Sequence, residues 1–193
     1  MLFFMLSLKS SSQYVWKQEK DKDGIKVYIA SREGSKFRAV KVECTLKGTY
    51  AKLFSILSDV TNQKNWVYNS KSSYLISRVS PAEIVYYTET HLPWPMNNRD
   101  AVIRLRFHTD SLPEFLTITG TGEPTYIPEK TGKVRVPHFK ANWKVTMPAG
   151  NSIRLIYIAE ADPGGSIPAW IANMFVDKGP FESFKKLSVL LSK

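Results

Sequence analysis

Apolar and polar residues alternate along much of the chain after residue 24, which is the pattern of strands with one buried face. Residues 25–29 alternate in this way, and the run from residue 40 to residue 46 does so more clearly. One face of that run holds Val40, Val42, Cys44 and Leu46. Lys41, Glu43 and Thr45 occupy the other face, so the two runs predict a half-buried β-hairpin.

The hydrophobic period changes after Gly48. Apolar residues then recur at the i, i+3, i+4 and i+7 positions of one helix face. These residues are Tyr50, Leu53, Phe54 and Leu57. Thr49 precedes them and is a suitable N-cap, so the pattern predicts a helix that begins at Tyr50. Residues 62–66 predict a second short helical turn.

Strand patterns return six times after these helices, separated by Pro, Gly, Asn and Asp clusters. They cover residues 73–79, 83–91, 101–109, 115–120, 134–147 and 153–160. Their hairpin-length spacing predicts a large antiparallel sheet. The clearest strand places Phe139, Ala141, Trp143, Val145 and Met147 on one face and polar residues on the other. We therefore expect one face of the sheet to meet water and the other to meet an apolar interior.

A last apolar stripe follows the turn at residues 162–165 and repeats at three- and four-residue intervals. Its members are Ile167, Trp170, Ile171, Met174, Phe175, Phe181, Phe184, Leu187 and Leu191. The stripe predicts a long terminal helix that covers a curved sheet. Gly179 and Pro180 interrupt the helical pattern, so we expect a kink or break near Val176–Gly179.

The composition fits one globular domain, because the chain has 193 residues of which 43% are hydrophobic. We expect a single domain over residues 14–193, preceded by an apolar tail or signal-peptide remnant over residues 1–13. The apolar run at residues 1–8 is too short to span a bilayer. A secreted or periplasmic location is expected if residues 1–12 belong to a signal peptide, and a cytoplasmic one otherwise.

The net charge, the single cysteine and the spacing of the histidines limit which functions the chain is expected to have. A net charge of +10 favours anionic partners, either a phospholipid surface or nucleic acid. The single cysteine, Cys44, excludes an intramolecular disulfide and cysteine-rich metal sites. His91, His108 and His138 have no local metal-ligand spacing, so no metal and no cofactor are expected. The inward faces are aromatic and aliphatic, which suits an apolar ligand.

Several segments together resemble the START domains (steroidogenic acute regulatory protein-related lipid transfer), a branch of the helix-grip or Bet v 1-like superfamily. The similar segments are residues 23–28, 57–60, 93–100, 123–135 and 162–170, together with Trp66. The run Pro93–Asp100, with the sequence PWPMNNRD, is the most specific, because it is similar to the same stretch in phosphatidylcholine-transfer members.

The resemblance implies an α+β helix-grip fold, in which a curved antiparallel sheet wraps around a long C-terminal helix and leaves a hydrophobic cavity between them. It implies non-catalytic binding, transfer or sensing of a lipid or sterol-like ligand, gated by that helix and by an Ω-loop at Glu123–Gly132. The cavity and lid residues it implies are Tyr87, Glu89, Ile103, Leu105, Phe107, Phe139, Trp143, Trp170, Ile171, Met174 and Phe175. Those of the gate loop are Tyr126, Ile127 and Pro128.

One position departs from the relatives. Members that bind polar-headed lipids commonly carry an inward arginine where this chain has Leu105, and their carboxylate partner corresponds to Glu89. Arg104 and Arg106 are expected on the opposite face of the strand. This departure favours a sterol-like or fatty ligand and leaves Glu89 unpaired or paired elsewhere. We expect Arg99 to pair with an acid, next to Asn and Asp side chains that hydrogen-bond within the loop.

Two other functions compete with the carrier interpretation. An enzyme on the same fold, of the cyclase or hydrolase type, would need a polar pair in the cavity, drawn from Glu89, Tyr87, Tyr86 and Asp100. A basic protein-interaction or nucleic-acid adaptor would bind in a salt-dependent way without a cavity. We expect a monomer that binds a lipid or another hydrophobic small molecule, contacts an anionic membrane surface transiently, and does not bind nucleic acid.

Overall fold

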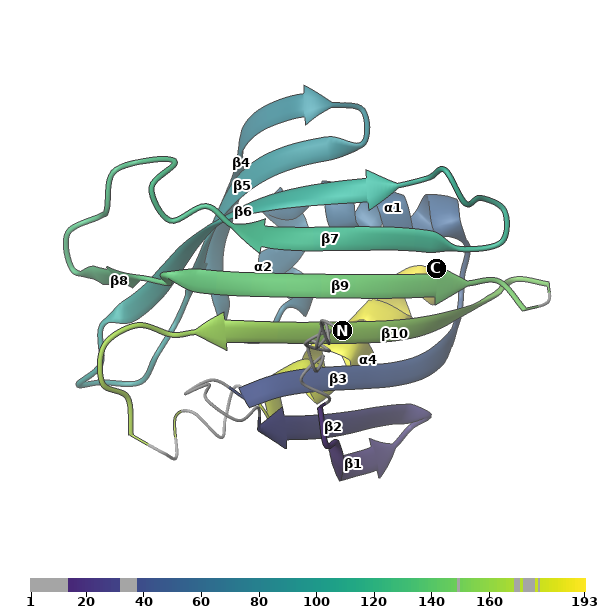
Figure 1. Ribbon diagram of the computed structural model, residues 1–193, viewed down its shortest axis with the longest axis horizontal. Helices are drawn as coiled ribbons and strands as arrows, with labels where there is room; N and C mark the ends of the chain where they lie inside the picture. The colour runs from purple at the N-terminus through teal and green to yellow at the C-terminus, as the bar shows by residue number, and fades with distance from the viewer. Residues whose placement is uncertain (1–13, 32–37, 149, 169–170, 172–175, 177) are drawn as a thin grey trace, which may run out of the picture.

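The computed structural model describes residues 14–31, 38–148, 150–168, 171, 176 and 178–193. Within these residues the chain forms one ten-stranded sheet and helices that lie on one of its faces (Figure 1). The architecture is the α+β helix-grip arrangement predicted from the sequence, with a curved, almost entirely antiparallel sheet and a C-terminal helix.

The first three strands are β1 (Lys17–Lys22), β2 (Ile25–Ser31) and β3 (Arg38–Lys47). β2 and β3 form the predicted hairpin pair, with Ile25 opposite Cys44 and Val27 opposite Val42. β1 pairs with β2 at the edge of the sheet and was not predicted. The reason lies in its sequence, KQEKDK, which has no apolar residue and therefore no alternation.

Helices α1 (Tyr50–Ser58) and α2 (Gln63–Trp66) follow β3, with the 3₁₀ turn η1 (Val60–Asn62) between them. The predicted N-cap is confirmed, because the Thr49 side chain accepts a hydrogen bond of 3.2 Å from the backbone N–H of Lys52. Leu53 and Leu57 are buried, as the helical spacing predicted, and Trp66 of α2 is buried beside them in the same core.

The remaining strands complete the sheet. They are β4 (Ser70–Ser80), β5 (Glu83–Thr90), β6 (Asn98–His108), β7 (Leu116–Gly122), β8 (Lys133–Arg135), β9 (His138–Thr146) and β10 (Ser152–Asp162). Their order in the sheet is β1-β2-β3-β10-β9-β7-β6-β5-β4, and the short β8 pairs in parallel with β6. The single strand predicted at residues 134–147 is split in two. Pro137 explains the break, since proline cannot donate to a ladder.

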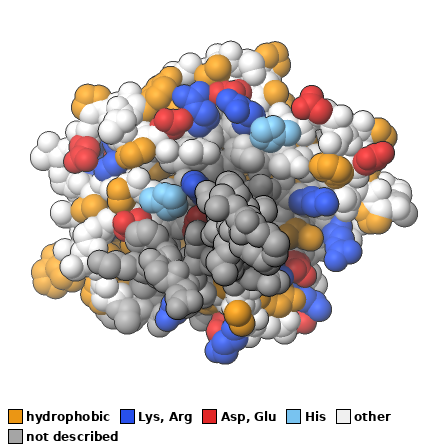
Figure 2. Space-filling view, in the orientation of Figure 1, with side chains coloured by type: hydrophobic (Ala, Val, Ile, Leu, Met, Phe, Trp, Pro, Cys, Tyr) orange, Lys and Arg blue, Asp and Glu red, His pale blue; other side chains and the backbone are white. Residues whose placement is uncertain are grey.

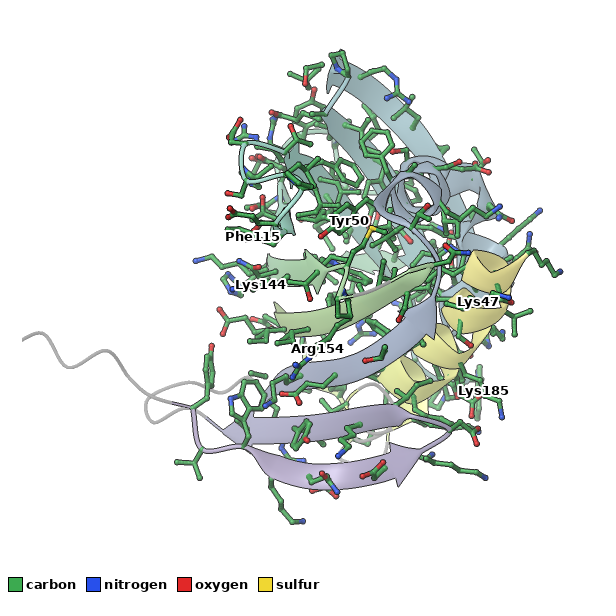
Figure 3. The ribbon with its side chains drawn as sticks, turned by 90° about the vertical axis from the view of Figure 1, so that its right-hand side faces the viewer. Lys47, Tyr50, Phe115, Lys144, Arg154 and Lys185 are labelled. Carbon is green, nitrogen blue, oxygen red and sulfur yellow. The ribbon has the colours of Figure 1, made fainter. Side chains whose placement is uncertain are left out.

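The two faces of the sheet differ as the alternation predicted. On β9, Ala141, Trp143 and Val145 are buried, whereas Lys140, Asn142 and Lys144 are exposed. Figure 3 shows Lys144 and Arg154 projecting on the side away from α4, while Lys185 lies on the outer surface of that helix. We call the helix-covered face concave and the opposite face convex.

The last helix, α4 (Gly179–Ser192), packs on the concave face with Phe181, Phe184, Leu187 and Leu191 buried. Most of the segment between Ser166 and α4, which was predicted to be helical, lies outside the described residues. Val176 and Lys178 are π-helical, and regular α-helix begins at Gly179, within the predicted break. Across the described part of the chain, no helix has the length and apolar composition needed to cross a membrane.

Leu187 tests how much α4 contributes to the core. Its side chain is completely buried, so Leu187→Ala should lower the free energy of unfolding by about 3 kcal/mol through lost burial and a residual cavity. Val189, on the same helix, is 51% exposed, and Val189→Ala should change stability by less than about 0.5 kcal/mol. Urea denaturation measures both. Equal effects of the two substitutions would contradict this packing.

Candidate functional site

Five of the implied cavity residues share the concave face. Ile103, Leu105, Phe107 and Trp143 are buried in the main core, and Phe139 packs against that core while partly accessible. Arg104 and Arg106 point to the convex face as predicted, where both bond Glu83. β6 and β9 therefore supply an apolar wall, and the position of Leu105 places no charge on it.

Small residues meet in one row across this wall. Gly120 of β7 lies opposite Ala141 of β9, which in turn lies opposite Ala159 of β10. The row crosses the middle of the sheet, yet Ala159 and its neighbour Tyr157 keep part of their surface accessible. The concave face thus carries short side chains at Ala141 and Ala159, whereas the Phe139 ring lies over Gly120, 3.3 Å from where a Cβ would be.

Aromatic rings border the row on the side of α4. The Tyr157 ring lies 4.5 Å from that of Trp143 and 5.4 Å from that of Phe184. Burial raises the pKa of the Tyr157 hydroxyl. Burial also raises the pKa of Tyr86 on β5, and Gln63 lies close enough to oppose that shift. These neutral groups are polar hydrogen-bonding partners on an otherwise apolar face.

The implied lid residues are only partly described. Ile171 is completely buried, and its N–H donates a 3.0 Å hydrogen bond to the carbonyl of Pro168. Trp170, Met174 and Phe175 lie outside the described residues.

Tyr87 and Glu89 do not line the concave face, which corrects their expected placement. Strand residues alternate between faces, and on β5 it is Ile84 and Tyr86 that reach the main core. Tyr87 instead forms a second, smaller apolar cluster with Val85 and Val102 on the convex side. The sequence hides this arrangement, because both faces of β5 are buried and no alternation appears.

Glu89 is held by polar partners on that convex side. Its carboxylate accepts hydrogen bonds from Asn98 at 2.6 Å and from Lys133, and Lys71 lies 3.4 Å away. Burial opposes ionisation, but the bonds from Lys133 and Asn98 outweigh it and lower the pKa of Glu89 to about 2. Glu89 is therefore a paired structural carboxylate and is ionised at neutral pH.

Asp100 forms the most deeply buried ion pair in the described structure. Both of its carboxylate oxygens accept from Arg135, at 2.8 and 3.1 Å. The same guanidinium donates to the carbonyls of Pro124, Ile127 and Pro128 in the loop that precedes β8. Arg135 thus fixes the loop between β7 and β8 to the convex face.

The implied gate loop, Glu123–Gly132, consequently covers the convex cluster. Ile127 packs against that cluster, and Lys130 lies over the Tyr87 ring at 3.9 Å. Tyr126 is 41% exposed and lies near Arg104, whereas Pro128 contributes its carbonyl to Arg135. In this structure the three implied gate residues contact the convex side of the sheet.

Arg99 has no acidic partner among the described residues, which corrects the expected ion pair. Its guanidinium donates to the carbonyls of Asn97 at 2.7 Å, Pro163 at 3.0 Å and Gly164 at 3.0 Å. Burial lowers the pKa of Arg99. The side chain joins the start of β6 to the turn that leads toward the C-terminal helix.

Cys44 is buried, as predicted. Burial raises the pKa of its thiol to about 12, so the sulfur is protonated at neutral pH and is a poor nucleophile. Its position within β3 makes it a core residue.

A separate groove of about 280 Å³ lies on the convex side. It is lined by Tyr14, Thr119, Gly120, Thr121, Lys140, Ala141, Asn142, Ile158, Ala159 and Glu160. The Tyr14 hydroxyl donates to Glu160 at 3.0 Å across it. Its lining includes the charged side chains of Lys140 and Glu160.

Comparison with known proteins matches most of this chain to members of one family. The sequence model of the START domain matches residues 5–192. An uncharacterized protein of Pseudomonas aeruginosa is 35% identical over 174 residues, covering 89% of this chain and 84% of that protein. The bovine (Bos taurus) phosphatidylcholine transfer protein is 28% identical over 169 residues, covering 85% and 78%. A solved STAR-related lipid transfer protein of Xanthomonas axonopodis has a TM-score of 0.83 and 32% identity, covering 92% of this chain and 99% of that one.

Removing Arg135 should loosen the loop and the sheet together. Arg135→Met leaves the buried Asp100 carboxylate without its ion pair, so we expect a loss of about 3–5 kcal/mol in stability and faster amide hydrogen exchange over residues 124–128. The control is Arg106→Met, because the Arg106 side chain is 51% exposed and its ion pair contributes about 1 kcal/mol or less. Unchanged exchange in the loop would refute this role.

Glu89 should make stability depend on pH in the acid range. Its pKa is lower in the folded protein, at about 2, than its ordinary value of 4.5, so the ionised form stabilises the fold. That contribution is complete above the ordinary value and is lost as pH falls toward the folded value. Urea denaturation should therefore show a gap between wild type and Glu89→Gln at neutral pH that narrows at about pH 3. A constant gap would contradict the assignment.

Proposed function

Because this chain belongs to the START domain family, we propose that it is a non-enzymatic carrier that binds one hydrophobic molecule between the concave face and the C-terminal helix. The observation that carries the proposal is the row Gly120–Ala141–Ala159, where the wall is apolar and its own side chains are short. Tyr157 remains partly accessible beside that row. Burying a lipid body there gains about 25 cal/mol per Å² of apolar surface.

The ligand class we propose is a lipid with an uncharged polar end, such as a sterol-like or fatty molecule. Similarity to the phosphatidylcholine transfer protein supports lipid binding in general. Leu105 occupies the wall position at which related proteins that bind polar-headed lipids commonly carry an arginine. The polar groups that remain on the concave face near it, Tyr86, Gln63 and Tyr157, are neutral hydrogen-bonding partners.

Ligand exchange requires the concave space to open at a membrane. Regular α4 begins at Gly179 next to Pro180, and this junction is the hinge that we propose for the helix. Since Arg135 holds the loop Glu123–Gly132 against the convex side, movement of the helical segment is the simpler route for a ligand to leave.

The competing enzyme interpretation loses three of its four candidate residues. Tyr87 and Glu89 lie on the convex side, and Asp100 is bound by Arg135. Tyr86 alone reaches the concave core. The enzyme would need a carboxylate of raised pKa beside a tyrosine, whereas the pKa of Glu89 is lowered.

Native mass spectrometry of the purified protein, followed by lipid mass spectrometry of an organic extract, tests the carrier proposal. We expect one lipid per chain in the wild type. Ala159→Phe should fill the row and reduce the bound lipid to less than about one tenth, because an aromatic ring occupies the space.

The matched control is Ile158→Phe, which places the same ring on the convex face one residue away. It should retain the lipid at wild-type stoichiometry. A wild-type protein that carries no lipid and binds none from a panel would exclude the carrier function.

A further inference from the structure

Trp94 is the most exposed large hydrophobic residue in the described structure, with 90% of its surface accessible. It lies in the loop between β5 and β6, between Pro93 and Pro95. Figure 1 shows this loop at one end of the sheet, and Figure 2 shows hydrophobic side chains projecting at the same edge. An indole held in water gains nothing for the fold, because it buries no surface there.

The loop that carries Trp94 is nevertheless fixed on both sides. Leu92 before it is buried, and its N–H donates to the Asn98 side chain at 3.2 Å. After it, the carbonyl of Asn97 accepts from Arg99. A turn closes between them, with the Met96 N–H donating to the Pro93 carbonyl at 3.1 Å. The exposed ring is thus presented on a supported loop.

Arg99 also places this loop beside the turn that leads to the C-terminal helix. Besides Asn97, its guanidinium holds the carbonyls of Pro163 and Gly164. The exposed Pro137 borders the same turn, since a Cβ on Gly164 would lie 3.3 Å from the Pro137 ring. Two exposed apolar residues, Trp94 and Pro137, therefore come from the segments that border this turn.

We propose that this end of the molecule docks on an anionic lipid bilayer, with the Trp94 ring inserted among the headgroups. Indole rings favour the membrane interface, because the ring is apolar and its N–H is a hydrogen-bond donor. The net charge of +10 attracts the chain to an anionic surface. The proposal rests on the carrier function to the extent that docking brings the C-terminal segment to the membrane that receives the ligand.

Sedimentation with vesicles of equimolar phosphatidylcholine and phosphatidylglycerol, and with vesicles of phosphatidylcholine alone, tests the docking surface. We expect the wild type to bind the anionic vesicles more tightly, and Trp94→Ala to weaken that binding about tenfold. Leu112→Ala is the control, because Leu112 is 41% exposed in the loop at the opposite end of the sheet, and it should bind as the wild type does. Vesicles with brominated acyl chains should quench the tryptophan fluorescence of the wild type more strongly than that of Trp94→Phe.

Two results would overturn the docking proposal. One is binding of Trp94→Ala that equals wild-type binding. The other is a wild type that stays in the supernatant with both kinds of vesicle, which would assign the exposed ring to a protein partner instead. Lipid mass spectrometry of the same samples keeps the two hypotheses apart, because Trp94→Ala should still contain its lipid. A wild type that contains no lipid before vesicles are added would count against the carrier function.

Discussion

Much of the remaining structure depends on the buried ion pair between Asp100 and Arg135. Their side chains are 1% and 3% exposed, and removing two charges from water costs several kcal/mol for each. Attraction between them offsets that cost only if their other hydrogen-bonding positions are filled. Three backbone carbonyls between residues 124 and 128 fill those of the guanidinium. The pair therefore requires the loop in this conformation, and the loop in turn excludes water from the pair.

Asn98 and Arg99, the two residues before Asp100, also bind neighbouring segments through their side chains, and they do so on both faces of the sheet. Asn98 bonds Glu89 and the backbone of Leu92, while Arg99 binds the turn at residues 163 and 164. Consecutive side chains of one strand thus hold three separate segments in place. Since most of this polar network lies at the end of β6 and on the convex side, the centre of the concave face is left to apolar groups. Such a division suits a protein whose interior must accept an apolar guest.

Sequence patterns predicted those strands in which one face meets water. Trp143 and Lys144 differ in burial as their alternation predicted, and the helix after Thr49 begins at the predicted cap. Prediction failed for β1, which has no apolar residue, and for the faces of β5, which is buried on both sides. The sequence also could not predict the partners of Arg99. They are backbone carbonyls as many as 65 positions away, and a backbone carbonyl has no sequence signature.

The sheet is open, and its two edges differ from its interior in a way that affects self-association. β1 at one edge contains only polar residues, including three lysines, and the pairing of β4 at the other edge is interrupted by three register shifts. Charged and irregular edges disfavour strand addition, because an incoming strand must bury ammonium groups or match a broken ladder. Continuous sheets across neighbouring molecules are thereby opposed. If the apolar interior opens for ligand exchange, as we propose, it can then stay free of the intermolecular β-pairing that leads to aggregation.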